Sequence, residues 1–220
     1  MSNLKFFENL TANNPKYLVI LLHGYGANGE NLLSLSNEFK DLVPDGNFIS
    51  PNAVEDWEGG FPNCYQWFSL YADVERRPFE QTVQNIKESN LKLSDFISAQ
   101  LKRFNLTYDK LILAGFSQGA MMSIYQGLTK DVVPAGIISF SGRVILPEMI
   151  GDQIISKPKI CLIHGEKDSV VPFDHFVQGK EILSKYGIEH QSFSFPNLDH
   201  SIDINAVRAA QQFIKSLNLK

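Results

Sequence analysis

The sequence predicts an α/β fold in which helices cover both faces of a mostly parallel central sheet. Short apolar runs alternate with amphipathic runs along the whole chain, which is the pattern of parallel strands linked by crossover helices. The composition agrees, because 44% hydrophobic and 20% charged residues are typical of a globular domain. A chain of 220 residues can bury one sizeable core, so we expect a single domain over residues 1–220.

The first part of the chain is predicted to begin with a buried, mostly aliphatic strand over 17–22. Apolar residues then return at helical spacing over 32–42, and Pro44 ends that helix. A short strand follows over 47–50. Residues 51–78 show no clean period and hold many aromatic side chains, so we expect a long functional loop there.

A long helix is predicted next, because Pro78 suits a first helical turn and apolar residues from Val83 to Phe104 mark one face. The second half of the chain then repeats the order of strand and helix. Its predicted elements are a strand over 111–114, a helix over 120–128, strands over 135–140 and 159–163, a helix over 176–186, a strand over 193–195 and a helix over 206–217.

Charge and apolar patterning exclude several classes of function. The chain has 20 Lys and Arg against 24 Asp and Glu, without a basic block, so we expect no nucleic-acid partner. Its aliphatic run over 17–22 is far shorter than the about 20 residues of a membrane span, and residues 1–15 lack the features of a secretory signal. We therefore expect no integral membrane segment and a cytoplasmic location. Cys64 and Cys161 lack metal-ligand spacing, so neither a disulfide nor a zinc site is predicted.

The pentapeptide 115–119, Gly-Phe-Ser-Gln-Gly, is a G-x-S-x-G motif between a predicted strand and a predicted helix. This arrangement exposes a serine at the carboxyl end of a sheet and makes Ser117 a candidate nucleophile. A glycine-rich structural turn is the alternative interpretation. A serine hydroxyl needs a base and an orienting acid, and Asp168 and His200 follow in loops after later strands. Asp199, beside that histidine, is a rival for the acid.

The other histidines have simpler interpretations. His175 and His190 are expected at the surface, and His164 is expected to be packed at a strand end. Residues 23–26, His-Gly-Tyr-Gly, follow the first strand, where backbone amides could face a developing oxyanion. That role would belong to the amides and not to the His23 imidazole.

With these motifs the chain resembles the phospholipase/carboxylesterase family of α/β hydrolases, which includes bacterial carboxylesterases and acyl-protein thioesterases. The resemblance covers nearly the whole chain. Its motifs are His23-Gly24-Tyr25-Gly26, Trp67-Phe68, the pentapeptide 115–119, Ser141-Gly142, His164-Gly165 with Asp168 and Val170-Val171-Pro172, and His200-Ser201.

The resemblance implies an α/β-hydrolase fold and a catalytic triad of Ser117, His200 and Asp168. It also implies an oxyanion hole formed by the backbone N–H groups of Tyr25 and Gln118. The enzyme would hydrolyse carboxylic esters or thioesters of acyl chains through an acyl-enzyme, without a metal or organic cofactor. Its substrates would be small-molecule or lipid acyl esters and thioesters, or an acylated protein, and the chain would be a monomer or homodimer.

Two positions depart from the family pattern. Family members often have a second Gly after the motif and a Leu after the first His-Gly, where this chain has Ala120 and Tyr25. Tyr25 could narrow or polarise the site, which puts the acyl-chain preference in doubt. The aromatic segment 57–71, including Trp67 and Phe68, is expected to line or cover an apolar acyl site, and packing of these rings onto the domain is the alternative.

Three other functions are weighed against this one. A dienelactone hydrolase would normally have Cys where Ser117 stands, and a small peptidase usually carries an extra domain or lid. A non-catalytic lipid-binding module on the same scaffold is the alternative from another class, because a fold does not guarantee a function. The presence of Ser, Asp and His in the expected order argues against it.

Overall fold

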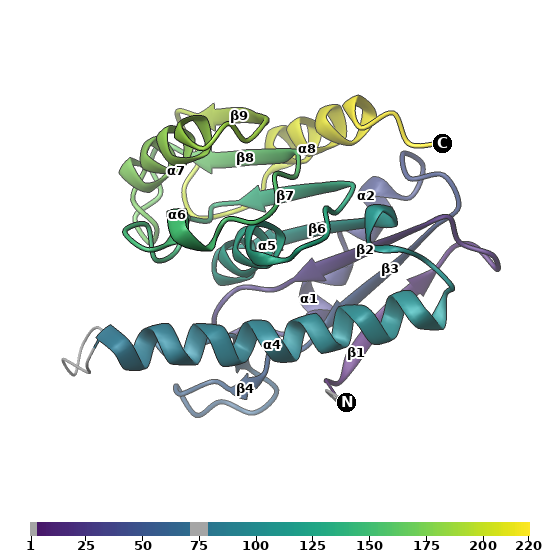
Figure 1. Cartoon of the computed structure of the whole chain (residues 1–220), viewed down its shortest axis with the longest axis horizontal. Coiled ribbons are helices and arrows are strands. Elements are labelled where there is room, and N and C mark those ends of the chain that lie inside the picture. Colours follow the sequence, from purple (N-terminus) through teal and green to yellow (C-terminus); the bar gives the residue numbers. More distant parts are fainter. Residues whose placement is uncertain (1–3, 71–78) are drawn as a thin grey trace.

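The computed structural model describes residues 4–70 and 79–220, and its main feature is a seven-stranded sheet (Figure 1). The strands of this sheet are β1 (Phe6–Leu10), β2 (Tyr17–Leu22), β3 (Gly46–Pro51), β6 (Leu111–Phe116), β7 (Gly136–Phe140), β8 (Ile160–Gly165) and β9 (His190–Phe195). Their spatial order is β1-β3-β2-β6-β7-β8-β9, and all neighbours are parallel except β1 and β3. The predicted, mostly parallel sheet is confirmed.

Helices cover both faces of the sheet, as the sequence predicts (Figure 1). The described α-helices are α1 (Gly29–Leu33), α2 (Ser36–Phe39), α4 (Phe79–Arg103), α5 (Gln118–Thr129), α6 (Ile150–Gln153), α7 (Asp174–Lys185) and α8 (Ile204–Ser216). Helices α4, α5, α6 and α7 lie on the face towards the viewer, and α1, α2 and α8 lie behind the sheet. Within the described ranges, no helix has both the length and the apolar character that crossing a bilayer requires.

Two apolar cores, one on each face, hold the sheet between the helices. Along β2, Leu18 and Ile20 belong to the core under α4 and α5, whereas Val19 and Leu21 belong to the core under α2 and α8. This division follows from the alternation of side chains along a strand, and a strand buried on both faces is therefore apolar throughout. Each such buried side chain contributes about 1.5–3 kcal/mol.

The predicted helix over 32–42 is wrong in detail, because the structure has two short helices there. The Leu35 N–H donates to the Leu32 carbonyl over 3.1 Å, which is a tight turn of the 3₁₀ type. The Ser34 hydroxyl donates to the Asn31 carbonyl over 3.1 Å. Serine competes for backbone partners in this way, which favours helix ends over helix interiors.

Some elements were not predicted at all. Strand β1 is only half-buried, and its sequence lacks a clear period. It pairs antiparallel with β3, and its Phe6 ring lies edge-on to the Phe96 ring. The predicted long loop contains a small hairpin of β4 (Glu55–Asp56) and β5 (Tyr65–Gln66). Residues 71–78, which include the predicted helix start at Pro78, lie outside the described residues.

Candidate active site

The predicted catalytic residues follow the carboxyl ends of three parallel strands. Ser117 directly follows β6, Asp168 follows β8, and His200 lies between β9 and α8. Parallel strands present their carboxyl ends at one edge of a sheet, which brings these distant residues to a common place. Ser117 and His200 both line one cavity at this edge.

The turn that carries Ser117 is sharp and tightly packed. Ser117 has φ 52° and ψ −118°, a conformation unfavourable for a residue with a Cβ atom. Its N–H donates to the Phe140 carbonyl over 2.9 Å, and its carbonyl accepts from the Met121 N–H over 3.1 Å. A Cβ atom at Gly119 would lie 1.9 Å from the Leu22 carbonyl oxygen, so only glycine allows this close approach to β2.

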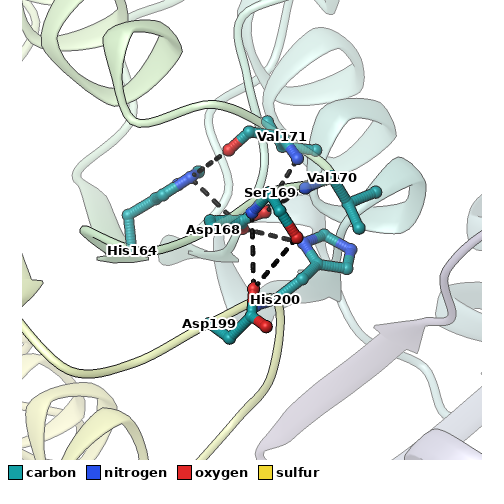
Figure 2. A network of polar contacts seen from close by, with 7 residues as sticks. All are labelled: His164, Asp168, Ser169, Val170, Val171, Asp199 and His200. Carbon is teal, nitrogen blue, oxygen red and sulfur yellow. Dashed lines mark hydrogen bonds and ion pairs between the residues drawn. The ribbon is translucent and has the colours of Figure 1, made fainter.

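Asp168 is held rigidly and bonds the imidazole of His200 (Figure 2). Its Oδ1 accepts the backbone N–H groups of Val170 over 3.0 Å and Val171 over 2.7 Å. Its Oδ2 lies 2.8 Å from His200 Nδ1. Because a carboxylate accepts only, this contact places the proton on Nδ1 and leaves Nε2 of His200 able to accept one.

His164 lies on the other side of the same carboxylate (Figure 2). It is buried, as predicted, and its Nε2 lies 2.8 Å from the Val171 carbonyl oxygen and 3.4 Å from Asp168 Oδ2. The pKa of His164 is lowered, mainly by burial and also by the neighbouring His200 and His175, although the contacts with Val171 and Asp168 raise it. A neutral His164 therefore packs against Asp168 without competing for a full ion pair.

Asp199 makes different contacts from Asp168. Its exposed carboxylate accepts the backbone N–H of His200 over 2.8 Å and that of Ser169 over 3.3 Å (Figure 2). These hydrogen bonds lower the pKa of Asp199. Asp199 thus fixes the loop backbone, whereas Asp168 bonds the imidazole ring.

The cavity beside Ser117 has a volume of about 530 Å³, within the usual range of ligand sites. Its walls are mainly apolar, formed by Leu70, Phe116, Met121, Val170, Val171 and Pro172. The Phe116 ring lies 4.8 Å from the His200 ring, centroid to centroid. Among the described residues, the Ser117 hydroxyl forms no hydrogen bond with His200, and such contacts commonly tighten only when substrate binds.

His175 and His190 are less exposed than the sequence predicts. His175 is half-buried and lines the cavity, because the first turn of α7 faces the carboxyl edge of the sheet. His190, at the start of β9, is half-buried and its Nδ1 lies 3.0 Å from the Ile188 carbonyl oxygen.

Trp67 and Phe68 lie inside the core and do not line the cavity, which corrects the expected role of these rings as an acyl wall. Their exposed fractions are 0% and 3%. Trp67 Nε1 donates to the His23 carbonyl over 2.9 Å. The Gln118 carboxamide accepts the Trp67 N–H over 2.8 Å and donates to the Phe68 carbonyl over 2.7 Å. Among the described residues of this loop, Leu70 lines the cavity.

Both residues of the predicted oxyanion hole, Tyr25 and Gln118, line the cavity. Gln118 is the first residue of α5, and the N–H groups of a first helical turn have no partner within the helix. The loop of Tyr25 is braced by His23, whose Nε2 accepts the Ala53 N–H over 2.9 Å. Burial lowers the pKa of His23 to about 4, so the ring is neutral and serves as an acceptor.

Glu58 holds several parts of the site together, and the sequence did not predict this role. Its carboxylate accepts the hydroxyl of Tyr25, the hydroxyl of Ser69 over 2.5 Å, the N–H of Leu70 over 3.0 Å and the carboxamide of Gln66 over 3.3 Å. Burial raises the pKa of Glu58, but these hydrogen bonds together outweigh it and lower the pKa. No sequence signal marks Glu58, because Tyr25 is distant in sequence and the other partners come from a loop without periodicity.

Comparisons with known proteins place these features in a wider context. A model of the phospholipase/carboxylesterase family matches residues 9–218. Acyl-protein thioesterase 1 of Emericella nidulans is 27% identical, over 89% of this chain and 88% of that protein. Esterase YpfH of Escherichia coli is 28% identical, over 90% of this chain and 82% of that protein.

Solved structures show the same architecture. The crystal structure of esterase PE8 has a TM-score of 0.88 and 33% sequence identity, and the match covers 97% of this chain and 98% of that one. A carboxylesterase of Bacillus cereus, at 15% identity, has a TM-score of 0.80 over 98% of this chain and 95% of that one. The expected α/β-hydrolase fold is confirmed.

Proposed function

Because this chain belongs to the phospholipase/carboxylesterase family, we propose that it hydrolyses carboxylic esters or thioesters of acyl chains with Ser117 as nucleophile. The observation that carries this proposal is the 2.8 Å contact between Asp168 Oδ2 and His200 Nδ1, at the edge of the cavity that Ser117 lines. This contact leaves Nε2 of His200 able to accept a proton in the cavity that Ser117, on a strained turn, also lines, and these are the parts of a serine hydrolase site.

The reaction begins when Ser117 Oγ attacks the substrate carbonyl carbon and His200 Nε2 takes the hydroxyl proton. The tetrahedral intermediate collapses, the carbon–oxygen or carbon–sulfur bond breaks, and His200 returns the proton to the leaving alcohol or thiol. Water then attacks the acyl-enzyme and gives a proton to His200. The bond between the acyl carbon and Ser117 Oγ breaks, His200 returns the proton to Oγ, and the carboxylic acid leaves. Asp168 stabilises the imidazolium and keeps its proton on Nδ1.

The backbone N–H groups of Tyr25 and Gln118 form the oxyanion hole in this proposal. Loss of a single donor of this kind elsewhere lowers kcat by about 100- to 1000-fold. Two hydrogen-bond systems support the positions of these amides. The Gln118 carboxamide bonds the backbone of residues 67–68, and Glu58 accepts the hydroxyl of Tyr25.

The test is hydrolysis of p-nitrophenyl esters from acetate to palmitate by the wild type and by Ser117→Ala. We expect turnover by the wild type and a loss of at least about 10³-fold in the variant. A fluorophosphonate, which reacts only with an activated serine, should label the wild type alone. An octanoyl thioester assayed beside p-nitrophenyl octanoate then compares thioester with oxyester hydrolysis.

If neither protein hydrolyses any ester, or if Ser117→Ala keeps its activity, the proposal is wrong. A non-catalytic lipid-binding module would then explain the apolar cavity, and fluorescent fatty acids would test for binding.

A further inference from the structure

We infer that Arg143 recognises a carboxylate on the substrate, so that the preferred esters carry an anionic group besides the scissile bond. This inference deepens the proposed function and rests on it. Arg143 lies in the turn after β7 and lines the same cavity as Ser117 and His200.

Arg143 brings a fixed positive charge to the cavity wall. Among the described residues that line the cavity, it is the only Lys, Arg, Asp or Glu. The whole chain is acidic, with a net charge of −4, so a lone cation beside the nucleophile is not a consequence of composition. Such a charge makes the cavity favourable for an anion.

The guanidinium also lacks a partner among the described residues. Across residues 4–70 and 79–220, Arg143 forms neither an ion pair nor a side-chain hydrogen bond. The residue is half-buried, and Met121, Val170 and Pro172 supply apolar surface in the same cavity. Removing a charge from water without a partner is costly, and low-dielectric surroundings strengthen any ionic contact that forms there.

The backbone beneath Arg143 is fixed before any ligand binds. Ser141 has a positive φ of 48°, and its N–H donates to the Ile163 carbonyl over 2.8 Å. A Cβ atom at Gly142 would lie 2.6 Å from the Cβ atom of Ala120, so this turn packs closely on α5. A rigid base lowers the entropy lost when the side chain binds a ligand.

The chemistry of the group selects the kind of anion. A guanidinium presents N–H donors in a planar fork that matches the two oxygens of a carboxylate, and it stays charged at all relevant pH values. A cavity of about 530 Å³ has room for the scissile ester and a short alkyl spacer that ends in a carboxylate. The anion can stand on the acyl part or on the alcohol part of the ester.

Two pairs of substrates show whether the carboxylate lies on the acyl part or on the alcohol part of the ester. Monomethyl adipate against methyl hexanoate places the carboxylate on the acyl part, and 3-carboxypropyl hexanoate against butyl hexanoate places it on the alcohol part. We expect Arg143→Met to lower kcat/KM for one anionic ester by about 10- to 100-fold and for its neutral partner by less than about threefold. Arg143→Lys keeps the charge but loses the planar fork of donors. Its kcat/KM for the anionic ester should lie between the values of the wild type and of Arg143→Met.

The exposed Arg208 on α8 provides the matched control, because Arg208→Met removes the same charge away from the cavity. It should leave the ratio of anionic to neutral turnover unchanged. The inference is overturned if Arg143→Met leaves this ratio unchanged in both pairs, or lowers anionic and neutral turnover equally.

A binding measurement keeps this test separate from the test of the proposed function. Calorimetric titration of monomethyl adipate and of 3-carboxypropyl hexanoate into Ser117→Ala and into the double variant Ser117→Ala/Arg143→Met needs no turnover. We expect Kd for one of these two esters to rise by about 10-fold or more in the double variant. If no ester is hydrolysed, the proposed function fails, and Kd values that are equal in the two proteins for both esters would overturn the role of Arg143.

Discussion

The carboxamide oxygen of Gln118 accepts the backbone N–H of Trp67 over 2.8 Å, so the residue after the proposed nucleophile holds a segment distant in sequence. The same carboxamide donates to the Phe68 carbonyl over 2.7 Å. The backbone N–H of Gln118 is meanwhile a proposed oxyanion donor. One residue therefore links the turn of Ser117 to the loop that packs beneath the site.

We expect Gln118→Ala to reduce both stability and activity. The substitution leaves the buried N–H of Trp67 and the carbonyl of Phe68 without partners, which costs about 1–3 kcal/mol for a buried group. The loop beside the oxyanion hole also loses its anchor, so kcat should fall by about 10-fold or more. Urea unfolding and ester kinetics on the same samples measure the two effects.

Gln126→Ala is the matched control for this prediction. Gln126 is also buried on α5, but its carboxamide bonds the Tyr108 hydroxyl over 3.0 Å, near the other end of the helix. This variant should lose stability and keep kcat/KM within about threefold. An equal loss of activity in both variants would mean that the effect comes from general destabilisation.

The two neighbouring acids should differ sharply in their effect on turnover. Asp168→Asn should lower kcat by about 10³- to 10⁴-fold, because an amide donating to His200 Nδ1 forces the proton onto Nε2. Asp199→Asn should cost less than about 10-fold, because the amide oxygen can still accept the N–H groups of His200 and Ser169. Steady-state kinetics decide, and a larger loss at Asp199 would reverse the assignment.

Much of the fold could be predicted because its signals are local. The apolar run of β2 and the glycines around Ser117 each impose their structure within a few residues. The half-buried strand β1 has no such signal, because its place depends on pairing with β3.

The catalytic candidates could likewise be predicted from chain order and strand ends, but their supporting contacts could not. Glu58 gains its structural role from hydrogen bonds with Tyr25 and with a later part of its own loop. Arg143 gains its proposed binding role from a cavity that five other segments line. Contacts of this kind depend on how the chain packs and leave no period or motif. The aromatic composition of its loop suggested Trp67 at the site, whereas the structure places its ring in the core.

Ser117→Gly should stabilise the protein while abolishing hydrolysis. The backbone at this position, with φ 52° and ψ −118°, costs a residue with a Cβ atom about 1–3 kcal/mol. Glycine removes that strain but costs about 0.4–1 kcal/mol through greater freedom of the unfolded chain. We therefore expect Ser117→Gly to be about 1 kcal/mol more stable than Ser117→Ala in urea unfolding. A less stable glycine variant would show that the turn is not strained.

Trp67 and Leu70 should have separable effects on substrate choice. Trp67→Ala should cost about 3–5 kcal/mol of stability, because it opens a cavity in the core, but should leave the order of preference among acyl chains unchanged. Leu70→Ala enlarges the cavity wall and should shift the optimum towards longer chains. The p-nitrophenyl ester series measures both profiles. A selective loss of long-chain hydrolysis in Trp67→Phe, which preserves more of the core, would restore the acyl-wall role.

Stability should fall as the pH drops from about 6.5 to 4, and His23 should account for part of the fall. Its pKa is about 4 in the folded protein and 6.5 in the unfolded chain, because burial disfavours the charged ring. The unfolded state therefore binds the proton first, so the stabilisation is complete above pH 6.5 and is lost towards pH 4. The full difference corresponds to about 3 kcal/mol.

His23→Gln provides the comparison, because a neutral carboxamide can accept the Ala53 N–H without titrating in this range. Urea unfolding of both proteins between pH 4 and 7 gives two stability curves. Carboxylates and His164 contribute equally to both stability curves. The difference between the two curves therefore isolates the contribution of His23. The variant should have the shallower slope, and the two curves should converge towards pH 4. Parallel curves would mean that His23 takes up its proton equally in the folded and unfolded states.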